Sequence, residues 1–267
     1  MQSIKVFGIA LFWAVPILVI APACVGQPAL GTDRIAHCPK GCPSGAPETN
    51  TRVIREIYTL SANRHTKLAD WVAYRITAET IGTSKDLNRS WRADPLLLDD
   101  ETLEPEDYRG ASKALAVDRG HQAPLAAFAG TLFWRDTNYL SNITPQKKAL
   151  NQGPWRILEE RVRTLAFERR EVYVLTRPVF DSSAGETASL PGADEPHSIP
   201  SGYWKIIYQY SGASAAFFFP QETPRNANYC AFQSDVNTLE GLTGLDFSGL
   251  KIAGGQPSGS LMEAIGC

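Results

Sequence analysis

The chain of 267 residues has no surplus of positive charge, no block of like charges, no internal repeat and no long low-complexity segment. Its 26 Lys and Arg residues face 28 Asp and Glu residues, which leaves a formal net charge of −2. This balance gives no support to a protein held on nucleic acid by bulk positive charge, because counterion release requires clustered Lys and Arg. It still allows an enzyme that contacts a few phosphates. The 43% of hydrophobic residues suffices for a sizeable core.

An uncharged stretch stands at the N-terminus. It runs from Val6 to Gly26 and contains Ala21-Pro22-Ala23, with small residues at the positions that a signal peptidase reads. We therefore predict residues 1–23 as a secretory signal peptide, an extracellular or periplasmic location, and no stable membrane association. Two alternatives stay open. One is a retained membrane anchor, since the stretch just reaches spanning length. The other is lipidation at Cys24, for which the preceding residues fit a lipoprotein motif poorly.

Cysteine is sparse, and its spacing is informative. If Cys24 leaves with the leader, four cysteines remain, an even number that suits an oxidising compartment and allows three pairings. The short interval between Cys38 and Cys42 favours a local loop, which leaves Cys230 to tie Cys267 at the C-terminus to the body. The alternative for the first pair is a metal site shared with His37. No second pair of metal ligands stands nearby in the sequence, so two disulfides are predicted.

The periodicity beyond residue 50 predicts one mixed domain. We expect an irregular N-terminal arm over 24–53, rich in Gly, Pro, Ala and Thr, and a single domain over 54–267. Apolar and β-branched runs predict strands at Ile54–Leu60, Asp70–Ile76, Tyr139–Thr144, Val172–Phe180, Tyr203–Tyr210 and Ala215–Phe219. Helical spacing predicts helices at Pro154–Arg169 and Ser234–Leu242. Because strands and helices do not alternate, the fold class is α+β with an antiparallel sheet.

Histidine is rare, so few residues can act as a general base near neutral pH. Of the four, His121 stands in Asp118-Arg119-Gly120-His121. A lone histidine beside an apolar stretch is more often structural. Here, however, a nearby carboxylate or a backbone acceptor could orient the imidazole, and Gly120 would leave room for a phosphate.

A second group of polar residues surrounds the predicted helix Pro154–Arg169. If the helical path is extended back to Asn151, then at about 100° per residue Asn151, Glu159 and Arg163 share roughly one third of the helix circumference. An amide oxygen with water suits Mg²⁺, and an arginine can grip a phosphate through two hydrogen bonds. The alternative is structural: Asn151 as a turn residue before the helix, and Glu159 with Arg163 as an exposed ion pair.

These sequence segments together resemble the DNA/RNA non-specific endonuclease family, whose members carry a ββα-metal or His-Me finger site. The resemblance covers nearly the whole chain after the leader and includes the spacing of the four remaining cysteines. The segments that carry it are Asp70–Tyr74, Asn88–Trp91, Ala93–Pro95, Asp118–Gln122, Asn138–Gln146, Asn151–Gly153 with Glu159 and Arg163, Ile199–Pro200 and Tyr203–Lys205.

The resemblance implies a one-metal phosphodiester hydrolase. His121 would be the general base, and Asn151 would bind Mg²⁺ directly. Glu159 would hold a water of the ion, while Arg89 and Arg163 would stabilise charge on the phosphoryl oxygens. Supporting roles are implied for Asp118, Arg119, Asn138 and Asn142.

The family also implies the substrates and the fold. Single- and double-stranded DNA and RNA would be cut to 5′-phosphorylated products, by a domain with an antiparallel sheet flanked by helices. A homodimer is expected as well. Two other functions remain in view: a secreted binding protein on an inactive nuclease fold, and a related enzyme that acts on another phosphodiester.

Overall fold

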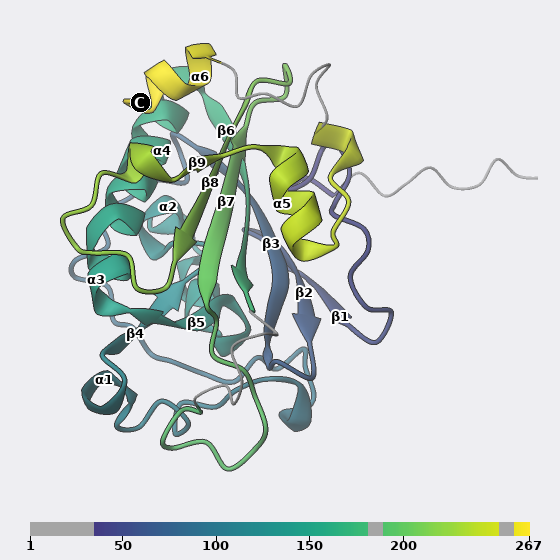
Figure 1. Cartoon of the computed structure of the whole chain (residues 1–267), viewed down its shortest axis with the longest axis vertical. Helices are drawn as coiled ribbons and strands as arrows, with labels where there is room; N and C mark the ends of the chain where they lie inside the picture. The colour runs from purple at the N-terminus through teal and green to yellow at the C-terminus, as the bar shows by residue number, and fades with distance from the viewer. Residues whose placement is uncertain (1–34, 181–188, 251–258) are drawn as a thin grey trace, which may run out of the picture. The chain divides into compact units, whose positions relative to one another are not determined.

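A seven-stranded antiparallel sheet organises the domain (Figure 1). The chain divides after Asp33, and the computed structural model describes residues 35–180, 189–250 and 259–267. The strand order is β1-β2-β3-β6-β7-β8-β9. The strands are β1 (Thr51–Ile54), β2 (Thr59–Asn63), β3 (Leu68–Thr77), β6 (Glu171–Val179), β7 (Gly202–Tyr208), β8 (Ser214–Pro220) and β9 (Gln233–Ser234). The predicted fold class, α+β with an antiparallel sheet, is confirmed.

Both faces of this sheet are buried, because successive side chains of a strand point to opposite sides. In β3, Val72, Tyr74 and Ile76 belong to one hydrophobic cluster. Their neighbours Trp71 and Ala73 belong to a second cluster on the other face. The sheet is therefore the middle layer of the domain.

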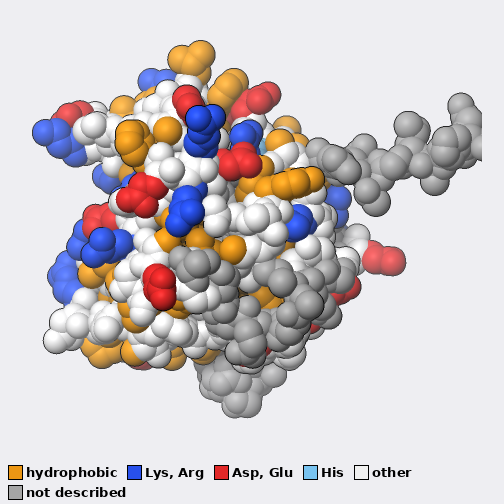
Figure 2. Space-filling view, turned by 90° about the horizontal axis from the view of Figure 1, so that it is seen from above, with side chains coloured by type: hydrophobic (Ala, Val, Ile, Leu, Met, Phe, Trp, Pro, Cys, Tyr) orange, Lys and Arg blue, Asp and Glu red, His pale blue; other side chains and the backbone are white. Residues whose placement is uncertain are grey.

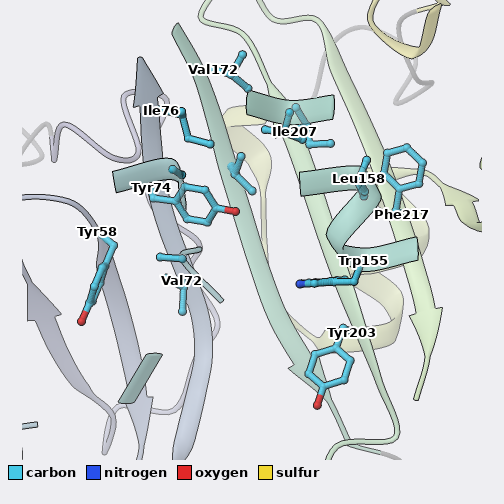
Figure 3. Close-up of a cluster of buried hydrophobic side chains, with 14 of the residues drawn as sticks. Tyr58, Val72, Tyr74, Ile76, Trp155, Leu158, Val172, Tyr203, Ile207 and Phe217 are labelled. Carbon is cyan, nitrogen blue, oxygen red and sulfur yellow. The ribbon is translucent and has the colours of Figure 1, made fainter. Parts of the chain in front are cut away.

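One long helix, α4 (Arg156–Arg169), covers the first face. Its buried residues Leu158, Val162, Leu165 and Ala166 recur at helical spacing and join the first cluster. Figure 3 shows Leu158 beside Phe217 and Ile207 of the sheet. The shorter helices α2 (Leu125–Phe128) and α6 (Gly259–Ala264) add apolar residues to the same cluster. The helix predicted at Pro154–Arg169 is confirmed, and it begins two residues later, at Arg156.

The helix α5 (Val236–Thr243) covers the opposite face with Val236 and Leu239. In Figure 1, α4 and α5 lie on opposite sides of the sheet. An Asp235 carboxylate oxygen accepts a hydrogen bond of 2.9 Å from the backbone nitrogen of Thr238. This N-cap starts the helix two residues after the predicted Ser234. Gly244 follows the helix with φ of 69°, a conformation that glycine adopts readily.

A separate two-stranded unit leads into α4. In it, β4 (Val117–His121), which follows α1 (Ala111–Ala114), pairs antiparallel with β5 (Ile143–Lys147). The chain then passes through α3 (Lys148–Leu150) and a wide turn, Asn151–Trp155, into α4. This is the ββα order that the family resemblance implies.

Two predicted strands are wrong in their bounds. Ile54–Leu60 is not one strand: β1 ends at Ile54, the backbone nitrogen of Arg55 donates to the Tyr58 oxygen at 2.9 Å, and β2 begins at Thr59. At this turn, the Arg55 guanidinium is ion-paired with Asp94, which anchors the turn to a distant loop. As a result, β1 begins at Thr51, within the range assigned to the N-terminal arm.

The strand predicted at Tyr139–Thr144 is also displaced. Leu140–Asn142 forms a short helical turn, and β5 starts only at Ile143. The cause is the Asn142 side chain, which donates to the backbone oxygens of Ala123 at 3.0 Å and Thr137 at 2.9 Å and thereby turns the chain.

The predicted disulfides, Cys38–Cys42 and Cys230–Cys267, are both present. The metal-site alternative for the first pair is wrong, since His37 bonds to the Thr59 hydroxyl at 2.9 Å and to the Glu56 backbone oxygen at 3.1 Å. In the described ranges, no three His, Cys, Asp or Glu residues group closely enough to hold a metal. The predicted leader, residues 1–23, and Cys24 lie outside those ranges. None of the helices in the described ranges has the length and apolar character needed to span a bilayer.

Candidate active site

A pocket of about 610 Å³ opens where β4 ends and α4 begins. All but two of the predicted site residues line it: Arg89, Asp118, Arg119, His121, Asn151, Glu159 and Arg163. The two exceptions, Asn138 and Asn142, are buried behind it. Residues from a loop, a strand and a helix thus face one shared space, which is the arrangement expected of an active site.

The β4–β5 ribbon places His121. It is the last residue of β4, and its Cα partner in β5 is Ile143. A Cβ atom added to Gly120 would lie 2.6 Å from the Gln146 side-chain oxygen. The space beside Gly120 therefore holds the buried Gln146, not a phosphate as predicted, and the glycine allows the ribbon to pack closely.

The His121 ring is oriented by Asn138. Its Nε2 lies 3.2 Å from the side-chain oxygen of Asn138. Since a carbonyl oxygen can only accept, Nε2 carries the hydrogen and donates it, so Nδ1 keeps its lone pair. The hydrogen-bond partner is an amide, not the carboxylate of Asp118 or a backbone atom that the sequence suggested. The ring of Trp91 lies beside the imidazole, with 5.3 Å between the ring centres.

The surroundings of His121 favour the neutral ring. Burial lowers the pKa of His121 to about 4, the hydrogen bond to Asn138 opposes this, and the charge of Arg89 lowers the pKa further. The side chain is consequently uncharged at neutral pH. An uncharged imidazole with a free Nδ1 lone pair can accept a proton.

Asn138 and Asn142 act as supports. Asn138 is only 1% exposed, so its amide is held rigidly against the histidine. Asn142 accepts a hydrogen bond of 2.8 Å from the backbone nitrogen of Ala123, in addition to its two bonds to backbone oxygens. It therefore joins the segment after His121 to the segment that carries Asn138, and fixes their separation.

The amide of Asn151 is oriented by Asp118. A carboxylate oxygen of Asp118 accepts hydrogen bonds from the side-chain nitrogens of Asn151, at 2.9 Å, and of Gln152, at 2.7 Å. The Asn151 nitrogen is thus engaged, and its oxygen is the atom left for a ligand in the pocket. Gln152 in turn accepts a hydrogen bond from Arg225. Asp118 therefore supports Asn151 and not His121.

Glu159 and Arg163 lie one turn apart on α4 and both line the pocket. The alternative of an exposed pair between them is wrong, because Glu159 is mostly buried and pairs with Lys205, with 3.5 Å between Oε1 and Nζ. Burial raises the pKa of Glu159, whereas the charges of Lys205 and Arg163 lower it.

Four arginines line the pocket, Arg89, Arg119, Arg156 and Arg163, and one of them, Arg156, is ion-paired with Glu160. Arg119 donates to the backbone oxygen of Pro105 at 2.9 Å and lies over the ring of Tyr108, which holds its guanidinium in place. Arg89 and Arg163 differ from it, because within the described part of the chain neither side chain makes a hydrogen bond or an ion pair of 4.0 Å or less. Their guanidinium groups are therefore available to an anion in the pocket.

Sequence reasoning did not assign roles to four residues near the site: Tyr74, Trp91, Gln152 and Lys205. One signal was present, because Lys205 is a charged residue inside the otherwise strand-like run Tyr203–Tyr210. Such a lysine on a central strand must either reach solvent or find a partner.

Comparisons with known proteins identify the family of this chain. A sequence model of the DNA/RNA non-specific endonuclease family matches residues 39–250. The chain is 46% identical over 220 residues to a nuclease of Serratia marcescens, an alignment that covers 80% of each chain. It is 31% identical over 212 residues to nuclease C1 of Cunninghamella echinulata var. echinulata, covering 72% of this chain and 81% of that protein.

A solved structure shares the fold. A chain in the crystal structure of an EndoG/EndoGI complex superposes with a TM-score of 0.67 and 21% sequence identity, covering 84% of this chain and 95% of that one. The fold is thus found in a second protein despite low identity, while the family model spans most of the present sequence. This chain belongs to the DNA/RNA non-specific endonucleases.

Proposed function

We propose that the protein hydrolyses internal phosphodiester bonds of DNA and RNA to products with a 5′-phosphate, with His121 as the general base. The observation that carries the proposal is the histidine itself: Nε2 is held by Asn138 at 3.2 Å, and burial keeps the ring neutral. Its Nδ1 is then ready to accept a proton beside a pocket with arginines.

The reaction is hydrolysis of a phosphodiester by one water molecule. The oxygen of a water molecule forms a bond to the phosphorus atom, and His121 takes the proton that this water releases. The bond between phosphorus and the 3′ oxygen breaks, so the phosphate stays on the 5′ carbon of the next nucleotide. The 3′ oxygen leaves as a hydroxyl after it takes a proton from solvent. Arg89 and Arg163 stabilise the charge that grows on the phosphoryl oxygens.

The residues of the pocket fit one Mg²⁺ ion. Asn151 would hold it through the amide oxygen that the hydrogen bond to Asp118 leaves exposed to ligands. Glu159 also lines the pocket, and its carboxylate is an acceptor that suits the outer water shell of such an ion. When bound there, Mg²⁺ would supply positive charge opposite the phosphate and the leaving oxygen.

The charge distribution supports contact with the nucleic-acid backbone and not with base edges. Figure 2 shows basic and acidic side chains interspersed on the face viewed from above, as expected for a net charge of −2. Attraction for phosphate must then come chiefly from Arg89, Arg119 and Arg163 in the pocket. Phosphate contacts carry no sequence information, which agrees with cleavage of DNA and RNA at many sequences.

Secretion is the proposed fate of the chain. The signal-peptide pattern over residues 1–23 supports export, and the disulfides Cys38–Cys42 and Cys230–Cys267 suit an oxidising extracellular or periplasmic compartment. The mature protein would then begin near Cys24. The homodimer implied by the family stays a prediction, which analytical ultracentrifugation of the mature protein tests.

The proposal is tested by assaying plasmid DNA, RNA and a small phosphodiester in parallel, with Mg²⁺ and with EDTA. We expect both nucleic acids to be cleaved in Mg²⁺ and neither in EDTA, with 5′-phosphate on the products. An inactive binding protein would cleave none of the substrates. An enzyme for another phosphodiester would prefer the small substrate. Either outcome would overturn the proposal.

A further inference from the structure

A lysine is completely buried beneath the active site. Lys205 lies on β7 and is 0% exposed. It points to the same face of the sheet as Tyr203 and Ile207, which belong to the first hydrophobic cluster, whereas Trp204 and Ile206 belong to the second. A charged group therefore occupies a core position, where burial is strongly unfavourable unless other groups compensate for it.

The Lys205 ammonium has three neighbours. Its Nζ lies 3.5 Å from Oε1 of Glu159, 3.1 Å from the hydroxyl of Tyr74 and 4.2 Å from the ring centre of Trp155. In Figure 3, the Tyr74 hydroxyl and the Trp155 indole nitrogen point toward one another across the cluster. The ammonium therefore lies in a polar gap within apolar surroundings, and the only carboxylate in contact with it, among the described residues, is that of Glu159.

The charges around Glu159 come from two elements. Lys205 approaches from the sheet, and Arg163 lies one turn further along α4; the Tyr74 hydroxyl contacts Lys205. Burial raises the pKa of Glu159, and Lys205 is the largest influence that lowers it. Burial lowers the pKa of Lys205 to about 8, so the ammonium is still mostly charged at pH 7.

We propose that Lys205 is a positioning residue for the nuclease reaction: its ammonium keeps Glu159 as a carboxylate aimed at the pocket, and the Tyr74 hydroxyl holds the ammonium there. The inference rests on the proposed function for its link to catalysis. Lys205 itself lines no part of the pocket. It acts from behind, through Glu159, and differs in this from Arg89 and Arg163, which face the substrate.

A double-mutant cycle tests the coupling. We expect Lys205→Met, which retains the shape of the side chain without its charge, to lower kcat about 10-fold or more on plasmid DNA and to change KM little. In a Glu159→Gln background, the same change should alter kcat by less than about two-fold, because the partner is already neutral. Equal losses in the two backgrounds would show a general effect on the fold and would overturn the proposal.

Two further variants separate the effect of the Lys205 charge from a general effect of losing a lysine. Lys205→Arg retains the charge and should keep more activity than Lys205→Met. Lys147→Met is the matched control. Lys147 lies on β5 outside the pocket, and its ammonium pairs with Glu222 at 3.2 Å. Removing this charge should leave kcat unchanged. If Lys205→Met does not fold, Tyr74→Phe replaces it in the same cycle, since it removes only the hydroxyl that holds the ammonium. The effect of Tyr74→Phe on kcat should likewise disappear in the Glu159→Gln background.

A direct measurement does not depend on activity. The NMR signal of the Glu159 side-chain carboxyl carbon is recorded as a function of pH in the metal-free protein. It is assigned as the signal that disappears in Glu159→Gln. We expect its titration to move to higher pH in Lys205→Met and to stay unchanged in Lys147→Met. An unchanged titration in Lys205→Met would overturn the inference even if the wild type proves an active nuclease. A wild type that cuts no nucleic acid would instead refute the proposed function.

Discussion

The Nε2 atom of His121 lies 3.2 Å from the side-chain oxygen of Asn138. This contact selects one tautomer of the imidazole, because the oxygen accepts and the ring nitrogen must donate. The nitrogen that remains, Nδ1, is the proposed base. Asn138 thus decides which atom of His121 can take a proton, although it does not line the pocket itself.

Replacing Asn138 by Ala should therefore lower kcat by about 10- to 100-fold through loss of the tautomer and of ring orientation, with a smaller change in KM. Because the amide is buried, the free energy of unfolding should also fall, by about 1–3 kcal/mol. Steady-state kinetics and urea unfolding measure the two effects. If the kinetics were unchanged while stability fell, the contact would be structural only.

The low pKa of His121 predicts the pH dependence. The reaction needs the neutral ring, and the pKa of His121 is lowered to about 4. As pH falls through about 4 the ring gains a proton and kcat/KM should fall; between pH 5 and 7 protonation of His121 should cost little activity. A rate profile on a short DNA duplex, with correction for acid unfolding by circular dichroism, measures the acid limb. A limb near the ordinary histidine value of about 6.5 would contradict the assignment.

Gly153 predicts a local stability effect. A Cβ atom at this position would lie 2.4 Å from the backbone oxygen of Arg225, and the residue has φ of −107° and ψ of −119°. Gly153→Ala should lower the free energy of unfolding by about 1–3 kcal/mol and reduce kcat, since the displaced turn carries Asn151. Thermal unfolding and plasmid cleavage measure these changes.

The control for that variant is Gly241→Ala. Gly241 lies within α5, and nothing stands within 4 Å of an added Cβ. Because alanine favours a helix more than glycine does, stability should rise by about 0.5–1 kcal/mol with kcat unchanged. Similar losses in both variants would show that Gly153 has no special role.

The proposed metal site predicts a graded response to EDTA and to substitution of Asn151 and Glu159. A single neutral ligand should bind Mg²⁺ weakly, so EDTA should abolish activity reversibly with little change in Tm. Asn151→Ala should impair kcat far more than substrate binding, because the ion acts on charge that develops in the transition state. Glu159→Ala should be less damaging, since solvent can replace an outer-shell partner. Normal turnover of Asn151→Ala in millimolar Mg²⁺ would refute the one-metal assignment.

The sequence predicted the site better than its supports. Glu159 and Arg163 lie on one face of α4, as local periodicity predicts, and both line the pocket. Asn151 lines it too, but it precedes α4 and is separated from it by the non-helical Gly153, so the turn and not helical periodicity places it there. The hydrogen bond from Asn151 to Asp118 and the ion pair of Glu159 with Lys205 join residues far apart in the chain. Periodicity carries no information on such contacts, because they depend on how β4, β7 and α4 pack.

The strand errors have a similar origin. The run Ile54–Leu60 has strand-like composition, yet it turns at Arg55, where that side chain pairs with Asp94 in a distant loop. Asn142 likewise interrupts a strand-like run with side-chain bonds to the backbone. In both places a long-range polar contact overrides local propensity, and both places border the segments that support the site.

The most direct test of the account is the turnover of His121→Ala on plasmid DNA and on RNA in saturating Mg²⁺, with the fold checked by circular dichroism. Loss of the general base predicts a fall in kcat of about 10²–10⁴-fold on both substrates, with Tm nearly unchanged. A folded variant that keeps more than about one tenth of wild-type turnover would contradict the central claim that His121 accepts the proton.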